Sequence, residues 1–584
     1  MSFSRRSQLL SDRSPVAYLS MEIAVTPAMP TYSGGLGVLA GDTLRAAADM
    51  GLNLVAVTLV HRCGYFRQHL DADGTQTEEP QPWHPERALA EEQPIVSLMI
   101  EDRTVSIRAW RYDLEGVSGH IIPIYFLDTD LEENDSEDRR LTDRLYGGDG
   151  DNRLRQEAVL GMGGARILDA LGYLPVVYHM NEGHAALLTV ALLEQERHGA
   201  NVDHASDEDI ESVRQRCVFT THTPVPAGHD RFSSEQANRI LGTDRARLLE
   251  RVGAFHDGLL NMTYIALRFS RYVNGVAMQH GKVSREMFPD YAISAITNGV
   301  HAGTWAAPSF QAAFDRHMPR WRYDNLALRY AIDIPEAEIA AAHAESKKTL
   351  LLSVKDRTGD ELRPEIFTLG FARRAATYKR SDLLFQDPDR LVRLAHDFGG
   401  LQILYAGKAH PADEPGKAMI RHVIELAKEL NSEELKIVYL ENYEWTLGAL
   451  LTGGVDLWLN TPKRPYEASG TSGMKAALNG VPSLSILDGW WIEGWIEGVT
   501  GWAIADRDDA AGEADSLYDH LEQTILPLFT RHPEQWQRIM RSTIALNGSY
   551  FNTQRMLEQY VLNAYFPETV ASFKGITPEP AMAK

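Results

Sequence analysis

Cysteine is scarce in this sequence. Only Cys63 and Cys217 occur among its 584 residues, which excludes a disulfide framework and a four-cysteine metal site. No apolar run approaches the roughly 18 residues of a membrane-spanning helix. The N-terminal segment MSFSRRSQLLSDRSPVAYLS has arginines but lacks the apolar region of a signal peptide. These absences predict a cytoplasmic protein that has no membrane partner.

Positive charge is also in deficit. Lysine and arginine number 58 against 80 aspartates and glutamates, so the net charge is −22. Such a chain is a poor non-specific ligand for nucleic acid or anionic membranes, and an anionic ligand would require a local cluster of cations. The length exceeds that of one hydrophobic core and predicts at least two domains.

Apolar strands and helical segments alternate along the chain. The expected strands are AYLSMEIA, LNLVAVTLVH, VVYHMN and CVFTTHT in the first half, and EIFTLGFA, LQILYAGK, KIVYLEN, VDLWLN and PSLSILDG in the second. Continuous apolar strands that alternate with helices predict an α/β fold with parallel sheets covered on both faces. Ligands are expected at the carboxyl ends of the strands. The turn-rich segment YAISAITNGVHAGTWAAPSF places the domain boundary near residue 300, and FNTQRMLEQYVLNAYF predicts an amphipathic C-terminal helix.

The glycine-rich segment SGGLGVLAGD lies between a predicted strand and a predicted helix. Residues 35–40 match the dinucleotide fingerprint G-x-G-x-x-A, in which glycines let a phosphate approach backbone N–H groups. The following strand ends in His61 and Arg62 without the acidic residue of an NAD site. This disfavours a dehydrogenase and leaves two interpretations open, an anion site and a tight structural turn.

The segment FARRAATYKRSD carries Arg373, Arg374, Lys379 and Arg380 directly after a predicted strand. Arginine forks and lysine point charges suit phosphate oxygens. A run of charges can also be a solvated surface, but its place at a strand end in an acidic protein favours an anion site.

The segment EASGTSGMKAALNG predicts a short helix capped by Thr471 or Ser472 and ended by Gly480. Lys475 would then lie near the positive end of the helix dipole, which disfavours its ammonium form. A neutral lysine can form a Schiff base, and the neighbouring hydroxyls could hold a phosphate. Both features suit pyridoxal phosphate; the alternative is a surface lysine on a short helix.

This lysine segment closely resembles the cofactor segment of the α-glucan phosphorylases, the glycogen, starch and maltodextrin phosphorylase family. YSGGLGVLAGDTLRAAADMGL resembles the family's glycine loop, THTPVP its histidine segment, ITNGVHAGTW its domain junction and ARRAATYKR its basic segment. The resemblance implies two facing Rossmann-like domains, as in B-type glycosyltransferases, with the active site in the cleft between them. The domains would be residues 1–297 and 298–548, with a C-terminal helix in 549–584 that crosses back to the first.

The resemblance also implies residue roles. Lys475, Arg374, Lys379 and His222 would be catalytic. Pyridoxal phosphate, covalently held by Lys475, would also be bound by Thr471, Ser472, Gly473, Arg373 and Tyr443. Arg374, Lys379 and the Gly34–Gly35 backbone would bind the substrate phosphate. The remaining substrate-binding residues would be Asn298, Glu467, Ser469, Gly470 and Tyr378.

The reaction so implied is reversible phosphorolysis of terminal α-1,4 bonds of an α-glucan or maltodextrin by orthophosphate. It would release α-glucose 1-phosphate with retained configuration, with the cofactor phosphate as acid and base. No pair of protein carboxylates would then be needed, unlike in a glycosidase. The resemblance alone leaves the preferred glucan length and the oligomeric state, including a homodimer, open.

Other functions stay in view. A nucleotide-sugar-dependent glucan synthase of the same fold would carry E-x7-E, whereas here Glu467 is followed after seven residues by Lys475. A catalytically silent glucan-binding protein would have no need of this lysine or of the basic segment. A metal hydrolase would have to use histidines that lack HExxH spacing, namely His179, His184, His222 and His229.

The sequence departs from the best-known family members at several points. Residues 375–377 read Ala-Ala-Thr where those members have a histidine and an acid, and residues 472–473 read Ser-Gly in place of Gly-Asn. Ile23 and Ala24 replace an aromatic pair, so packing around the cofactor is expected to differ. The chain is shorter than these members, and no phosphorylation switch of the animal type is expected.

Overall fold

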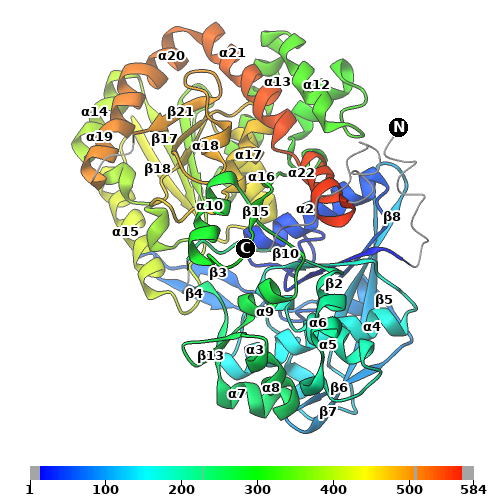
Figure 1. The fold of residues 1–584 in the computed structure, drawn as a ribbon. Helices are drawn as coiled ribbons and strands as arrows, with labels where there is room; N and C mark the ends of the chain where they lie inside the picture. Colours follow the sequence, from blue (N-terminus) through cyan, green and yellow to red (C-terminus); the bar gives the residue numbers. More distant parts are fainter. Residues whose placement is uncertain (1–13, 226–227, 506–508, 568–584) are drawn as a thin grey trace.

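Two β-sheets, one from each half of the chain, form the framework of the molecule (Figure 1). The structure is a computed structural model that describes residues 14–225, 228–505 and 509–567. The last residue of the segment THTPVP, at position 226, lies outside the described part, as do residues 568–584 of the C-terminal segment. Within the described residues, no helix combines the length and apolar character needed to cross a membrane.

The sheet of the first half has ten strands, in the order β15-β14-β10-β9-β1-β2-β8-β7-β5, with β6 paired to β7. Its parallel strands are β1 (Val16–Ser20), β2 (Leu54–Leu59), β8 (Ile121–Asp128), β9 (Val177–Asn181), β10 (Cys217–Thr220), β14 (Tyr272–Gly275) and β15 (Ser294–Ala295). All are largely buried except the short edge strand β15. The four strands predicted here are all present.

One edge of this sheet is antiparallel, and its strands were not among those predicted from the sequence. The edge consists of β5 (Ala90–Glu91), β6 (Val96–Ile100) and β7 (Arg103–Glu115), and β7 runs antiparallel to β8. Side chains of β7 alternate between buried and more exposed over much of its length, as expected for an antiparallel strand with one solvated face.

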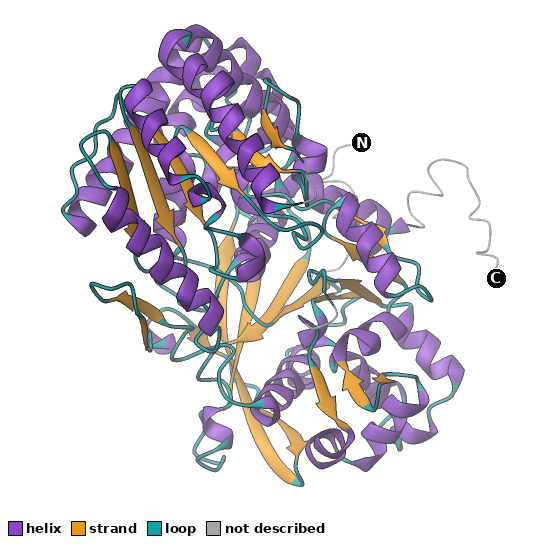
Figure 2. Cartoon of the chain, turned by 90° about the vertical axis from the view of Figure 1, so that its left-hand side faces the viewer, coloured by secondary structure: helices purple, strands orange, loops and turns teal. Residues whose placement is uncertain are grey.

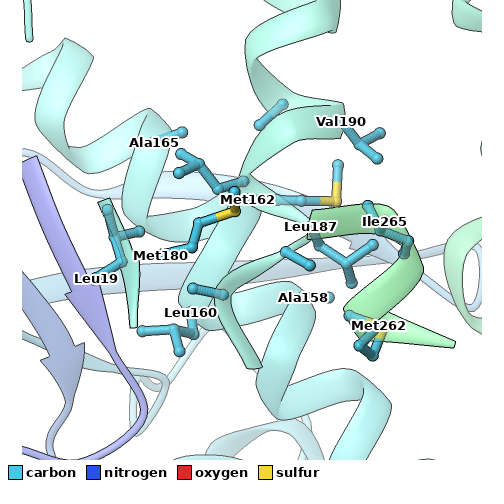
Figure 3. Close-up of a cluster of buried hydrophobic side chains, with 14 of the residues drawn as sticks. Leu19, Ala158, Leu160, Met162, Ala165, Met180, Leu187, Val190, Met262 and Ile265 are labelled. Atoms are coloured by element: carbon cyan, nitrogen blue, oxygen red, sulfur yellow. The ribbon is translucent and has the colours of Figure 1, made fainter. Parts of the chain in front are cut away.

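Helices cover both faces of the parallel strands. In the first half these are α2 (Gly35–Met50), α3 (Gly150–Ala158), α4 (Gly164–Ala170), α5 (Leu188–Glu196), α6 (Asp207–Arg214), α7 (Ser234–Leu241), α8 (Thr243–Arg251), α9 (Met262–Arg268) and α10 (Met278–Met287). On one face, Leu19 of β1 and Met180 of β9 pack with Leu160, Met162 and Leu187 from the helical layer (Figure 3). This burial of apolar area is the main stabilising contribution in the first half.

The second sheet has six strands, all parallel, in the order β18-β17-β16-β19-β20-β21. They are β16 (Phe367–Ala372), β17 (Leu401–Ala406), β18 (Leu435–Leu440), β19 (Leu457–Asn460), β20 (Ser483–Ile486) and β21 (Gly501–Ile504). The first five were predicted, whereas β21 was not. Figure 2 shows helices on both sides of these strands.

The helices of the second half follow in chain order. They are α11 (Ala302–Trp305), α12 (Pro308–His317), α13 (Glu336–Thr358), α14 (Pro388–Asp397), α15 (Glu414–Leu430), α16 (Trp445–Gly454), α17 (Thr471–Leu478), α18 (Trp491–Gly494), α19 (Ala510–His520), α20 (Leu526–Arg531) and α21 (Pro533–Thr543). Each strand-to-helix turn therefore places its residues at the carboxyl edge of the sheet, where a ligand site is expected.

Helix α22 (Thr553–Tyr560), near the end of the described chain, returns to the first half. It lies beside α2 in Figure 1, and its Met556 and Leu557 share a buried cluster with Leu39 and Leu44 of α2. The Tyr560 hydroxyl accepts a hydrogen bond from Asn274 Nδ2 at 2.9 Å. The chain thus passes twice between the two sheets.

A hairpin of the first half reaches the strand ends of the second sheet. It is formed by β3 (Arg67–Leu70) and β4 (Gln76–Glu79). Gln68 Nε2 donates to the Gly407 carbonyl and Gln76 Nε2 to the Ala409 carbonyl, both at 2.9 Å. Because both glutamines are buried, these bonds tie the hairpin to the loop after β17 and close one side of the space between the sheets.

Candidate active site

A cavity of about 990 Å³ lies between the two halves and is lined by residues of both. Fifteen of the sixteen residues expected at the site line it: Gly34, Gly35, His222, Asn298, Arg373, Arg374, Tyr378, Lys379, Tyr443, Glu467, Ser469, Gly470, Thr471, Ser472 and Lys475. The sixteenth, Gly473, does not. A Cβ on Gly473 would come within 2.7 Å of Trp490, so this glycine allows α17 to pack against an indole.

Lys475 is buried on α17 with its ammonium group facing a ring. Its Nζ lies 3.5 Å from the centroid of the Trp305 ring. Burial lowers the pKa of Lys475 to about 8, opposed by the negative charge of Asp42. A neutral amine is therefore accessible near physiological pH, which is the form a nucleophilic lysine requires.

The reason given for this from the sequence was wrong. Lys475 is the fifth of the eight residues of α17, not part of its first turn, and burial rather than the helix dipole lowers its pKa. The N-cap is Gly470 in the left-handed conformation, with no side-chain cap, instead of Thr471 or Ser472. The hydroxyls of these two residues are consequently not used in capping, and Ser472 Oγ accepts a bond from Trp458 Nε1 at 3.1 Å.

Three of the four cations of the basic segment reach the cavity. Lys379 Nζ lies 2.6 Å from Glu467 Oε2, and Arg373 pairs with the same carboxylate. Burial alone would raise the pKa of Glu467, but the charges of Arg373 and Lys379 outweigh it and lower this pKa to about 2. Arg380 points away and pairs with Glu513, so it is not part of the anion site.

Arg374 extends into the cavity, and no carboxylate among the described residues forms an ion pair with it. It lies close to Tyr378: burial would raise the pKa of this phenol, but the charges of Lys379 and Arg374 lower it. An arginine that faces a cavity without a carboxylate partner is available for an anionic ligand.

The glycine loop meets the cavity at the start of α2. The first turn of this helix has no side-chain cap and no acidic residue, so its N–H groups are available to an anion. The Gly34 amide, however, donates to Glu22 Oε2 at 3.3 Å, and the Ser33 amide does so at 2.5 Å. Glu22 also accepts a bond from the Tyr146 hydroxyl at 2.9 Å. Neither Glu22 nor Tyr146 was proposed from the sequence.

His222 is held at the cavity wall by two neighbours. Its Nε2 lies 2.7 Å from Asn181 Oδ1, and its backbone amide donates to Glu182 Oε2 at 2.6 Å. Burial lowers the pKa of His222 to about 4, so the imidazole is neutral at physiological pH. Glu182 has a φ of 72°, an uncommon conformation for a glutamate that is typical of functional sites.

The cavity wall contains buried polar atoms that have no protein partner. Among them are Asn298 Oδ1, Ser469 Oγ and Arg373 Nη1. Because buried polar groups are normally hydrogen-bonded, these atoms indicate a ligand that offers hydroxyl donors and anionic acceptors. Lys408 also lines the cavity; it was missed, although its place after the strand LQILYAGK could have revealed it.

In the described part of the chain, the four histidines considered for a metal hydrolase form no common metal site. His179 bonds Tyr565 and Thr220 in the interior, and His229 bonds Thr263. His184 Nε2 lies 3.3 Å from Asp230 Oδ2, and Arg153 Nε lies 3.3 Å from the same oxygen. Glu157, His184 and Asp230 could each direct one atom to a common point, but Arg153 supplies positive charge there.

Comparisons with known proteins give one consistent result. Residues 227–499 match the model of the carbohydrate phosphorylases. The chain is 38% identical to the maltodextrin phosphorylase of Thermococcus litoralis, over 94% of this chain and 70% of that protein. It is 39% identical to the glycogen phosphorylase of Mycobacterium tuberculosis, over 94% of this chain and 71% of that protein. It is 32% identical to the glycogen phosphorylase of Aquifex aeolicus, over 95% of this chain and 86% of that protein. The chain belongs to the carbohydrate phosphorylase family of glycosyltransferase enzymes.

Proposed function

We propose that this enzyme catalyses the reversible phosphorolysis of terminal α-1,4 bonds in an α-glucan or maltodextrin, releasing α-glucose 1-phosphate with retention. The observation that carries the proposal is the meeting, in one cavity, of a buried lysine with a lowered pKa and a cluster of cations. The names of the relatives, glycogen and maltodextrin phosphorylases, support the glucan as substrate.

The residues around Lys475 fit pyridoxal phosphate. The Thr471 and Ser472 hydroxyls and the unpartnered Arg373 Nη1 could bind its phosphate, and Tyr443 lines the same part of the cavity. The backbone of Gly473 was also expected there. When bound, the cofactor would supply its phosphate group as the acid and base of the reaction. The protein's task is to hold this phosphate close to orthophosphate and to offset their repulsion.

Arg374, Lys379 and the N-terminus of α2 are proposed to bind orthophosphate. Lys379 also forms an ion pair with Glu467, whose carboxylate stays ionised because its pKa is about 2. That shared contact fixes the lysine before the substrate arrives, so little reorganisation is needed. Arg374 brings a second charge that no carboxylate of the described residues neutralises.

The glucosyl hydroxyls are assigned to other polar groups of the cavity lining. Asn298 Oδ1 and Ser469 Oγ are buried without partners, and Glu467 and Gly470 lie on the same loop as Ser469. His222 can accept or donate as a neutral imidazole, and Tyr378 gives the pocket an aromatic wall. In this assignment residues 1–297 and 298–548 are the two domains, and 549–584 is the returning segment.

The function is tested by a phosphate-dependence assay on the purified protein. With a maltodextrin or glycogen as substrate, we expect α-glucose 1-phosphate to form only when orthophosphate is present. The reverse reaction should extend a maltodextrin from α-glucose 1-phosphate and release phosphate. Glucan extension from a nucleotide sugar, without phosphorolysis, would instead show a synthase, and binding without turnover would show a silent glucan-binding protein.

Arg374→Ala is expected to raise the KM for orthophosphate by about tenfold or more, with a much smaller change in the KM for the glucan, because a charge-assisted contact to phosphate is lost. Steady-state kinetics with each substrate varied in turn measures this. Arg374→Lys, which keeps the charge but not the fork, should fall between the two proteins. Equal weakening towards both substrates would contradict the phosphate role.

A further inference from the structure

The Trp305 ring lies against Lys475, and its indole N–H contacts Asp42, a residue of the first half of the chain. The ring lies beneath Lys475 Nζ at 3.5 Å and stacks on Trp445, with ring centroids 5.5 Å apart and planes inclined by 23°. Trp305 is 2% exposed. The indole is thus held between the lysine and a second indole, and its orientation sets which face the ammonium group meets.

Asp42 of α2 fixes that orientation. Its Oδ2 accepts a hydrogen bond from Trp305 Nε1 at 2.7 Å and another from the His301 amide at 3.1 Å. The Asp42 carboxylate is 1% exposed, and its Oδ1 has no hydrogen-bond partner. Arg45 Nη1 lies 3.7 Å from Oδ1, near enough for attraction but too far for a hydrogen bond.

The backbone beneath the two side chains is also fixed. Asn479 Nδ2 donates to the Trp305 carbonyl at 2.9 Å and to the Lys475 carbonyl at 3.0 Å. Asn479 Oδ1 accepts a bond from the Ala307 amide. One buried amide therefore ties the backbone of α11 to that of α17, the two elements that carry the ring and the lysine.

We propose that Asp42 is a positioning residue for Lys475: it holds the Trp305 ring beneath Nζ, and through its charge and that ring it governs how readily Lys475 condenses with an aldehyde. The proposal deepens the proposed function, because the aldehyde in question is that of pyridoxal phosphate. It gives the last residue of SGGLGVLAGD a role other than forming a phosphate loop.

Three influences compete at the Lys475 amine. Burial favours the neutral form, whereas the negative charge of Asp42 and the negative face of the Trp305 ring favour the ammonium form. Of the described charged residues, Asp42 is the one whose charge acts on the pKa of Lys475. Arg45 flanks Asp42, and Asp49, further along α2, is paired with His301 at 2.8 Å.

The chemistry requires the neutral amine. The Nζ lone pair forms a bond to the aldehyde carbon, the carbonyl oxygen leaves as water, and the two amine protons leave with it. Removing the charge of Asp42 should lower the pKa of Lys475 and make the neutral form available at lower pH. Because Asn can still accept the bond from Trp305 Nε1, Asp42→Asn changes the charge while keeping the ring in place.

The test is the pH profile of Lys475 reactivity in the full-length protein, after bound pyridoxal phosphate has been removed so that Lys475 is a free amine. Formaldehyde with cyanoborohydride serves as a probe that needs no cofactor site, and methylation of the Lys475 peptide is quantified by mass spectrometry. For Asp42→Asn we expect the midpoint to fall by about one pH unit, which is a roughly tenfold faster reaction below the wild-type midpoint. Asp49→Asn, which removes a charge from the same helix, should leave the midpoint in place. Lys408 in each sample is the internal control.

An unchanged Lys475 midpoint in Asp42→Asn, or an equal shift in Asp49→Asn, overturns the proposal. Should Asp42→Asn fail to fold, Trp305→Phe is the second variant: its weaker ring quadrupole should lower the midpoint by a smaller amount, and no shift there overturns the proposal. Portions of the same samples that were not treated with formaldehyde are then loaded with pyridoxal phosphate. Absence of a Lys475 adduct in wild type would refute the cofactor assignment but would leave the formaldehyde result to decide the role of Asp42.

Discussion

Lys475→Ala is expected to abolish both cofactor binding and phosphorolysis. No other residue of α17 can replace the buried amine, since its other side chains are hydroxyls or apolar. The measurement is the near-ultraviolet absorbance of the purified protein, followed by borohydride reduction and peptide mass mapping. Wild type should carry a reduced pyridoxyl group on the Lys475 peptide, and the variant none, with no phosphate-dependent release of sugar phosphate.

The fold of this variant should survive. A charged amine in a buried place is costly, so its removal leaves a small cavity but also relieves a desolvation penalty. Lys428→Ala is the matched control, because Lys428 forms a surface ion pair with Asp73 far from the cavity lining. Full activity in Lys475→Ala, or a pyridoxyl group on another lysine of wild type, would contradict the cofactor assignment.

Much of the fold could be predicted because its strands are buried on both faces. Strands such as LQILYAGK are nearly continuous apolar runs, and β17 is buried throughout. The antiparallel edge was not predicted, because buried and exposed residues alternate along much of β7 and the strand therefore lacks the continuous apolar run of the parallel strands. The C-terminal helix could be recognised from its amphipathic period, but its packing on α2 depends on tertiary contacts that no local pattern contains.

Part of the candidate site could also be predicted from the sequence, and part of it could not. Residues in glycine-rich or basic segments at strand ends were found, because a parallel sheet brings its carboxyl ends together. Arg380 was misjudged, since its partner Glu513 lies far along the sequence. The interpretation of Lys475 named the correct property for the wrong reason: its environment is set by Trp305 and Asp42, two residues brought to it by the fold.

The two passages of the chain between the sheets lie against each other. The Val300 amide donates to the Phe551 carbonyl at 3.1 Å, and the Thr553 amide to the Val300 carbonyl at 3.0 Å. Arg555 Nη2 donates to the Asn298 carbonyl at 2.8 Å. The backbone of Asn298, whose side chain lines the cavity, is therefore held by the returning C-terminal segment.

Gly299→Ala is expected to lower both stability and activity, although residue 299 is not among those that line the cavity. A Cβ at this position would lie 2.2 Å from the Asn552 carbonyl carbon and oxygen, and backbone atoms cannot move aside as a flexible side chain can. The two passages must separate, at a cost of about 1–3 kcal/mol or more. Thermal unfolding and kcat/KM for phosphorolysis measure the two effects.

Gly548→Ala is the control for that substitution, because its nearest contact would be the Leu478 side chain at 3.3 Å, which can adjust. We expect this control to keep the melting temperature and the kinetics of wild type. Asn298 directly precedes Gly299 in the chain, so a displacement at residue 299 also moves Asn298. Gly299→Ala should therefore weaken glucan binding more than phosphate binding. A Gly299→Ala variant that is destabilised but has unchanged kinetics would show that the contact between the two passages stabilises the fold alone. It would contradict the expectation that this contact also positions Asn298.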